Sequence, residues 1–248
     1  MTILCYHTVD PEWRSPLSLA PDTFADHCRW LANNRQVVDL PRAIELVGPG
    51  GRLPRGVAAM TFDDGFASLH EHAWPILREH RLPATVFLVA ETLTPPGRVV
   101  DWVDPQPAVP PETLSREQVL EMRDDGIRFE SHSFSHRVLT ELDEVSCLRD
   151  LRLSREVLED LLDQPIRYLA YPKGRHDPMV RRAAELAGYS HAFALPESPE
   201  PRGPFSLPRA GVYPDNGVGA LRTKTTRWYP SLRTSRAFPL LRQVARRA

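Results

Sequence analysis

The sequence predicts a single α/β domain whose parallel strands close, or nearly close, into a barrel. The main observation is that short apolar segments alternate with helix-like segments about seven times, the pattern of βαβ units. The chain of 248 residues suits one such barrel, and its 42% hydrophobic residues suffice for a sizeable core. We find no internal repeat, and the Pro-rich segments 94–113 and 195–209 are expected to be surface loops rather than linkers.

Each repeat pairs a strand with the helix that follows it. Strands are expected where the apolar segments are short, at 2–9, 36–40, 56–65, 84–90, 127–133, 168–174 and 190–195. Helices are expected in the longer segments between them, at 20–34, 41–48, 66–80, 115–126, 145–163 and 177–188. We expect Asp22 or Thr23 to cap the first helix.

Charge and cysteine content exclude several classes of protein. The formal net charge of −1 argues against a general nucleic-acid binder. Cys5, Cys28 and Cys147 are far apart and form no Cys-x-x-Cys pair, so neither a zinc knuckle nor a disulfide framework is indicated. Each is expected to be a small buried residue.

The end of the chain differs in charge from the rest. Eight of the 31 basic residues and none of the 32 acidic ones lie in 216–248, which leaves 23 basic against 32 acidic residues in 1–215, a formal charge of −9. We expect 1–215 to be the barrel and 216–248 a basic extension, either packed over the acidic body or in peripheral contact with an anionic membrane. Because no signal peptide or membrane-length apolar segment is visible, the expected location is cytoplasmic, with the inner membrane face as the place of any such contact.

Polar residues follow three of the expected strands, and such strand ends converge on one face of a parallel α/β barrel. Asp63 and Asp64 end the segment 56–65, and His132 and His136 follow the strand at 127–133. Two imidazoles four residues apart can face the same way on a helical turn, and one carboxylate completes a ligand set for a divalent metal. The other aspartate is then free to act as a base on water whose pKa the cation lowers. Alone, the aspartate pair would suggest a helix cap, and the histidine segment a polar loop.

A family resemblance follows from these motifs together. The segments TFDDG, LPATVFLV, SHSFSH and YPKG, followed by AAELAGYSHAFA, closely resemble the polysaccharide deacetylase domain (NodB homology, carbohydrate esterase family 4). The segments CYHTVD and FSLPR are similar to the branch that contains poly-N-acetylglucosamine deacetylases of exopolysaccharide systems. The resemblance spans about residues 3–213. It implies a distorted (β/α)7 barrel and hydrolytic removal of an N-acetyl group from an amino sugar.

The resemblance also implies roles for individual residues. Asp64, His132 and His136 match the family's metal ligands, and Asp63 matches its catalytic base. The implied cofactor is one divalent ion, with zinc expected first and nickel, cobalt or iron compatible with the same ligands. A backbone N–H near Lys173 would help to stabilise the oxyanion.

Two family residues have no counterpart at their usual places. The arginine that normally orients the base is missing before YPKG, and we expect Arg209 to supply it, although a surface arginine in a Pro-rich loop is an equal alternative. The late histidine that normally serves as the acid is also missing. His7 is the first substitute and is otherwise a strand-end histidine bonded to backbone, while His176 and His191 are weaker candidates.

The substrate is the least determined feature. Trp102 lies in the expected loop 94–113, where it is either a sugar-stacking platform or a packing residue. With no export signal, we expect an N-acetylated sugar inside the cell, free, carrier-linked or oligomeric, and no nucleic-acid partner. A metal-dependent hydrolase of a non-sugar amide, or a catalytically silent carbohydrate-binding protein on the same fold, are the alternatives.

Overall fold

The computed structural model describes residues 2–47, 54–196, 203–226, 228–233 and 235. Its main sheet is parallel throughout, in the order β10-β9-β8-β7-β6-β5-β1-β11, with β4 paired to the start of β5. Its strands are β1 (Ile3–Tyr6), β4 (Gln36–Val37), β5 (Val57–Phe62), β6 (Thr85–Leu88), β7 (Arg128–Ser131), β8 (Tyr168–Ala170), β9 (His191–Ala194), β10 (Leu207–Pro208) and β11 (Ala210–Gly211). A separate pair is formed by β2 (Thr8–Val9) and β3 (Ser18–Leu19). The predicted parallel α/β barrel is confirmed.

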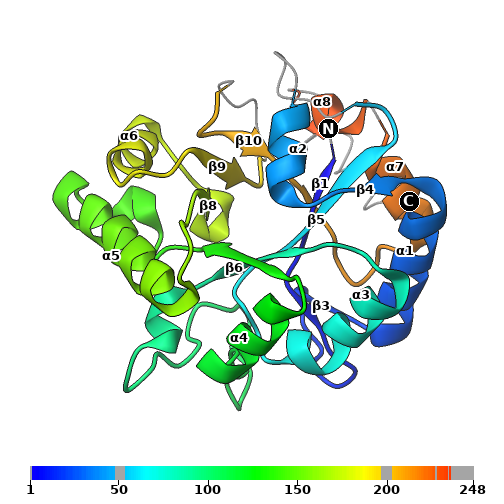
Figure 1. The fold of residues 1–248 in the computed structure, drawn as a ribbon, viewed down its shortest axis with the longest axis horizontal. Coiled ribbons are helices and arrows are strands. Elements are labelled where there is room, and N and C mark those ends of the chain that lie inside the picture. Colours follow the sequence, from blue (N-terminus) through cyan, green and yellow to red (C-terminus); the bar gives the residue numbers. More distant parts are fainter. Residues whose placement is uncertain (1, 48–53, 197–202, 227, 234, 236–248) are drawn as a thin grey trace.

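Helices surround the strands (Figure 1). They are α1 (Pro21–Asn34), α2 (Leu40–Leu46), α3 (Trp74–His80), α4 (Arg116–Asp124), α5 (Glu144–Leu162), α6 (Pro178–Leu186), α7 (Val218–Lys224) and α8 (Tyr229–Arg233). Side-chain caps define several starts: Asp39, Ser115, Asp143 and Asp177 each accept a backbone N–H of the first turn. The predicted cap of α1 is wrong, because the helix begins after Ala20 with Pro21 in its first turn and no side-chain cap.

Adjacent residues of β1 serve different layers of the core, because side chains alternate across a strand. Ile3 packs with Ala59, Phe87 and Phe193 in one buried cluster, which α2 joins through Leu40 and Ala43. Leu4 belongs to a larger cluster that includes apolar residues of α1, α3, α4, α5 and α6. The apolar strands therefore bury both faces, which explains why their sequences show no polar alternation.

One short segment, residues 207–211, joins the edge of the sheet at β9 to the edge at β1. Leu207 and Pro208 pair with β9, and after Arg209 the chain continues into β11, which pairs with β1. Backbone bonds reach both neighbours, from Arg209 N–H to the Ala194 carbonyl and from Val212 N–H to the Cys5 carbonyl. The sequence analysis expected only a loop at 195–209. Arg209 is consequently located at the seam of the barrel.

Two observed elements differ from the expected ones, one at its start and the other at its end. The helix expected at 66–80 begins as a wide π turn at Leu69–Ala73 before α3, next to Pro75, which lacks a backbone N–H. The strand expected at 168–174 stops at Ala170, and a 3-10 turn follows at Pro172–Gly174. Both changes are located at or near prolines, whose ring restricts the backbone.

The described part of the extension contacts the barrel near the start of the chain. Leu221 of α7 is fully buried, and the Lys224 ammonium donates to the Gly211 carbonyl at 2.7 Å. The Thr2 hydroxyl donates to the Lys224 carbonyl at 3.2 Å. The basic residues from 236 onward lie outside the described residues, so the boundary at 215/216 stays a prediction. None of the described helices has the length and apolar character needed to cross a bilayer.

Candidate active site

The polar residues singled out in the sequence meet at the carboxyl ends of the strands. Asp63 and Asp64 follow β5, His132 follows β7, and Lys173 follows β8. Neighbouring strands β5, β6, β7 and β8 run parallel, so these ends lie at the same edge. Both aspartates and both histidines are at most 5% exposed, so the group is buried within the mouth of the barrel.

Asp64, His132 and His136 form one compact group of donors. The Asp64 Oδ1 atom lies 3.1 Å from His136 Nε2 and 3.6 Å from His132 Nε2. The three ligand atoms all lie within 4.8 Å of one another. One carboxylate and two imidazoles are a donor set that zinc and related divalent ions accept.

The hydrogen bonding of His132 shows that a cation fits between these donors. Its Nδ1 lies 2.8 Å from the Ala170 carbonyl, which can only accept, so Nδ1 holds the proton and Nε2 presents a lone pair to Asp64. Burial lowers the pKa of His132 to about 4, which keeps the ring neutral. Two acceptors thus face each other in a buried site, and a positive ion between them removes the repulsion. Metal-ligating histidines commonly donate their other N–H to a carbonyl in this way.

Backbone strain is concentrated in the same place. Asp64, Ser133 and His136 have φ angles of 70°, 69° and 52°, which non-glycine residues rarely adopt. Gly65 follows with φ of 69°, and a Cβ there would lie 2.6 Å from the Leu88 side chain. The glycine of TFDDG therefore permits the tight bend after β5, and the surrounding packing holds the strained residues in place.

The sequence analysis considered a helical turn as the way for the two histidines to face the same side. They do not lie on such a turn. Residues 132–138 contain no helix, and Asp150 of α5 organises the loop instead. Its Oδ1 accepts the Phe134 N–H at 2.9 Å, and its Oδ2 accepts the N–H and the hydroxyl of Ser135. The sequence analysis missed Asp150, because an acidic residue within a long amphipathic helix resembles any solvated one.

Asp63 has a charged partner of its own. The Arg209 guanidinium donates from Nη1 to Oδ1 and from Nη2 to Oδ2, both at 2.6 Å, and also from Nη1 to the Thr61 hydroxyl at 3.1 Å. Burial is the largest influence on Asp63 and by itself would raise its pKa. The charge and hydrogen bonds of Arg209, together with the nearby imidazoles, jointly outweigh burial and hold that pKa well below its usual range. Asp63 is therefore a carboxylate, and the surface alternative for Arg209, which is 2% exposed, is wrong.

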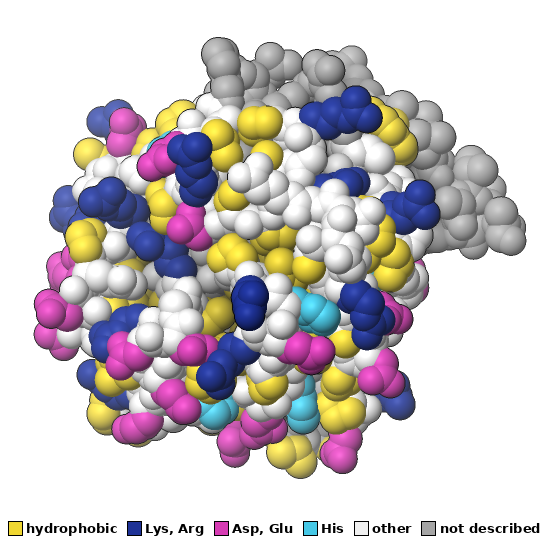
Figure 2. All heavy atoms as spheres, turned by 45° about the vertical axis from the view of Figure 1, so that its right-hand side comes forward, with side chains coloured by type: hydrophobic (Ala, Val, Ile, Leu, Met, Phe, Trp, Pro, Cys, Tyr) yellow, Lys and Arg dark blue, Asp and Glu magenta, His cyan; other side chains and the backbone are white. Residues whose placement is uncertain are grey.

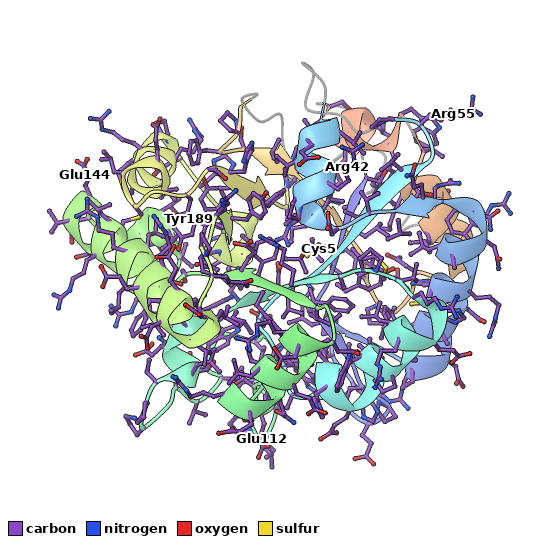
Figure 3. All side chains as sticks on the ribbon, viewed as in Figure 1. Cys5, Arg42, Arg55, Glu112, Glu144 and Tyr189 are labelled. Carbon is purple, nitrogen blue, oxygen red and sulfur yellow. The ribbon has the colours of Figure 1, made fainter. Side chains whose placement is uncertain are left out.

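Cys5 and His7 lie on the other side of Asp63. The Cys5 thiol donates to Asp63 Oδ2 at 3.3 Å. A ring nitrogen of His7 lies within 4.8 Å of the Cys5 sulfur and of an Asp63 carboxylate oxygen. Cys5 lies at the centre of the molecule (Figure 3), and burial raises the pKa of its thiol well above the usual value. A protonated thiol and an Arg209 that bonds both Asp63 oxygens disfavour a second cation here. The prediction that Cys5 is buried is confirmed, but its contact with Asp63 was missed.

Trp102 does not offer a face to a sugar. It is 9% exposed, and its ring stacks on His136 with centroids 4.7 Å apart and planes at 24°. Its indole N–H donates to Asp64 Oδ1 at 3.1 Å. The Arg98 guanidinium lies 5.6 Å from the ring centroid. The stacking-platform interpretation is therefore wrong, and the packing alternative is the correct one.

The turn after β8 contains one backbone N–H suited to an oxyanion. Tyr171 N–H donates to the Phe193 carbonyl and Gly174 N–H to the Tyr171 carbonyl, while Pro172 has no N–H. Within the described residues the N–H of Lys173, whose φ is 56°, has no acceptor. The other two histidine candidates lie apart from this group: His176 contacts Tyr171 and Arg181, and His191 contacts Tyr168 and Ser190.

Comparisons with known proteins bear on the family of this chain. Residues 50–192 match the family model named polysaccharide deacetylase. YxkH of Bacillus subtilis (strain 168), whose name assigns it to the polysaccharide deacetylases, is 25% identical over 217 residues, which are 86% of this chain and 72% of that protein. The poly-β-1,6-N-acetyl-D-glucosamine N-deacetylase of Staphylococcus aureus (strain NCTC 8325 / PS 47) is 23% identical over 189 residues, 73% of this chain. The chain spans only 62% of the length of that relative.

Solved structures support the fold. A Streptococcus pyogenes deacetylase, PplD, in complex with acetate superposes with a TM-score of 0.75 at 22% identity, covering 91% of this chain and 98% of that one. IcaB from Ammonifex degensii gives a TM-score of 0.74 at 24% identity, covering 90% and 96%. With a nearly closed parallel barrel of this type and a family match over more than half its length, the chain belongs to the polysaccharide deacetylase family and is a hydrolase of carbon–nitrogen bonds, an N-deacetylase.

Proposed function

We propose that this protein is a metal-dependent hydrolase that removes an N-acetyl group from an amino sugar. The observation that supports it most directly is a buried Asp64–His132–His136 donor group beside Asp63, a carboxylate that Arg209 keeps ionised. We expect zinc in this site first, with nickel, cobalt or iron compatible with the same donors. When bound, the cation would supply Lewis acidity that polarises an acetamide carbonyl and lowers the pKa of water.

In this proposal Asp63 is the general base. Its carboxylate accepts a proton from the attacking water, and Arg209 holds both carboxylate oxygens so that their direction does not vary. The Arg209 side chain is fully buried, so solvent does not screen the attraction between Arg209 and Asp63. Arg209 is thus assigned the orienting role that the family's usual arginine would have.

His7 and Lys173 are assigned to the rest of the reaction. His7 is half-buried, within 4.8 Å of the Asp63 carboxylate, and its Nδ1 has no partner among the described residues. It would protonate the leaving amine after the tetrahedral intermediate forms. The Lys173 N–H would donate to the developing oxyanion.

The substrate class rests on the relatives. The Staphylococcus aureus relative is named for poly-β-1,6-N-acetyl-D-glucosamine, and the chain covers less than two thirds of it. From that name we propose an N-acetylated amino sugar as the substrate, free, carrier-linked or oligomeric. Independently of the relatives, we propose the cytoplasm as the location. A carrier-linked sugar at the inner membrane face would suit the basic extension, whose last residues lie outside the described part.

Acetate release tests the catalytic proposal. The purified protein, supplied with zinc, would be assayed on free N-acetylglucosamine, its β-1,6-linked oligomers, a carrier-linked form and a simple aliphatic acetamide. We expect acetate from a sugar, at least about 100-fold less from Asp63→Asn, and no change in the control Asp22→Asn, an exposed residue in the first turn of α1. Acetate from only the aliphatic amide would refute the sugar assignment, and binding without acetate from any substrate would indicate a silent protein.

Vesicle binding tests the membrane proposal. The full chain would be sedimented with anionic and with neutral vesicles, beside a variant in which Arg242, Arg246 and Arg247 are changed to serine. We expect binding to anionic vesicles that decreases in the variant and with added salt. Equal recovery with both vesicle types would refute membrane contact.

A further inference from the structure

Trp102 is a buried aromatic residue on a long loop, and it touches two of the three donors of the proposed cation site. We propose that Trp102 is a positioning residue for this site: its N–H orients Asp64, its ring orients His136, and Lys173 holds it in place. This inference rests on the proposed function, because it concerns the same three donors. It goes beyond that function by assigning a role to Trp102, which takes no part in the proposed reaction steps.

The indole N–H determines which way the Asp64 carboxylate points. An aspartate can rotate about its last side-chain bond, and the 3.1 Å bond from Trp102 Nε1 keeps Oδ1 beside both imidazoles. A carboxylate oxygen has lone pairs for a donor and a cation together. Removing the N–H would leave that rotation restrained chiefly by the cation itself.

The indole ring supports His136, whose Nε2 faces Asp64 but whose Nδ1 has no hydrogen-bond partner among the described residues. His132 is oriented by its bond to the Ala170 carbonyl. His136 Nδ1 is buried, and within the described residues no bond to a carbonyl orients this ring from the side away from Asp64. Trp102 stacks on it at 4.7 Å, and the contact of two flat rings restricts the rotation that a hydrogen bond would otherwise prevent. The two histidines are thus held by different means.

Trp102 is itself held from two directions. The Lys173 ammonium, from the turn after β8, donates to the Trp102 carbonyl. Arg98, which pairs with Glu91 and Asp101, lies over the ring. Phe66, Val89, Val100 and Val103 pack with the indole in a small cluster separate from the main core, with Trp13 at its margin. Lys173 therefore links the loop that holds Trp102 to the strand end that contains the proposed oxyanion donor.

Cation release is the measurement that isolates this role. Trp102→Phe keeps an aromatic ring for the stack and the cluster but has no N–H. The matched control is Trp13→Phe, in the same cluster, where Trp13 contacts Phe66 with centroids 5.3 Å apart. Each full-length variant would be loaded with Co²⁺, and both its visible absorption spectrum and the rate of transfer to a chelator would be recorded, with circular dichroism as the check on folding.

We expect Trp102→Phe to lower cation affinity by about 10- to 100-fold, as changes to groups that orient metal ligands typically do. This loss should appear as faster transfer of cobalt to the chelator and as a shift of the cobalt absorption bands. Lys173→Met should change the release rate in the same direction by less, and Trp13→Phe should match the unchanged protein. If the unchanged protein binds cobalt but Trp102→Phe releases it at the same rate with the same spectrum, the role of Trp102 is refuted and the proposed function stands. If the unchanged protein binds no divalent cation, both are refuted.

Discussion

Asp63 and Asp64 are neighbours in the chain, yet the two sides of the site compensate their charges in opposite ways. Asp63 faces the barrel seam, where Arg209 donates to both of its oxygens. Asp64 faces the end of β7, where within the described residues it meets two imidazoles and an indole N–H but no lysine or arginine at ion-pair distance. One carboxylate has a built-in counter-ion, and the other lacks one. A buried charge without a partner is costly, so the cation should bind at Asp64.

The largest expected effect separates the two aspartates directly. Asp64→Asn should abolish stoichiometric cation binding, because it removes the charged ligand, whereas Asp63→Asn should keep it while turnover decreases by about 10²- to 10⁴-fold. Metal content after dialysis and acetate release would be measured on the same samples. Equal metal loss in both variants would contradict the division into a binding side and a base side.

The seam side can be tested through stability. Arg209→Met leaves Asp63 buried without its counter-ion, so we expect a loss of about 3–5 kcal/mol in the free energy of unfolding, measured in urea. Adding Asp63→Asn should recover part of it. Arg29→Met is the control, since its pair with Asp26 is 62% and 58% exposed, and its loss should stay below about 1 kcal/mol. Equal losses of unfolding free energy in Arg209→Met and Arg29→Met would contradict a stabilising role for the buried Arg209–Asp63 pair.

The histidine side depends on a helix residue. Asp150→Ala removes the acceptor for Phe134 N–H, Ser135 N–H and the Ser135 hydroxyl, so the loop to His136 should loosen and cation affinity should decrease about 10-fold. Asp143→Ala, which removes the N-cap of the same helix, should cost about 1 kcal/mol of stability without changing that affinity. Titration with a fluorescent zinc chelator as competitor would distinguish them, and equal affinities would refute the role of Asp150.

The smallest effect concerns an imidazole outside the site. Burial beside Tyr171, with Arg181 donating to its Nδ1, lowers the pKa of His176 to about 4. Because the unfolded chain binds this proton near pH 6.5 and the folded one only near 4, stability should decrease as pH decreases from about 6.5 to 4. His176→Gln should flatten that slope, measured as the urea midpoint at several pH values. An unchanged slope would show that His176 is not one of its sources.

Surface charge does not share this division. Acidic and basic side chains are interspersed over the face drawn in Figure 2, and the exposed pairs Arg29–Asp26 and Arg42–Glu45 each lie within a single helix. Exposed pairs of this kind contribute little to stability. On this face, the surface charge therefore shows no counterpart of the division found at the buried strand ends.

Local patterns in the sequence were enough for the order of strands and helices and for the donors at the ends of β5 and β7. A buried parallel strand is a short apolar run, and an amphipathic helix is a longer one, so both are visible without knowledge of neighbours. The segment TFDDG combines a strand end, two carboxylates and a glycine within five residues, and SHSFSH supplies two imidazoles. These features depend on nearest neighbours along the chain.

Only the tertiary structure decided the features that join distant segments. The two-residue strands on either side of Arg209 are too short to show a pattern, and their pairing with β9 and β1 brings Arg209 to Asp63 across 146 positions of the chain. The burial of Trp102 over His136, and the bonds from Asp150 to the histidine loop, likewise arise from packing of separate elements. The sequence by itself determined which chemical groups are present at the strand ends. Long-range packing determined how they are held, because orientation depends on contacts that no local pattern encodes.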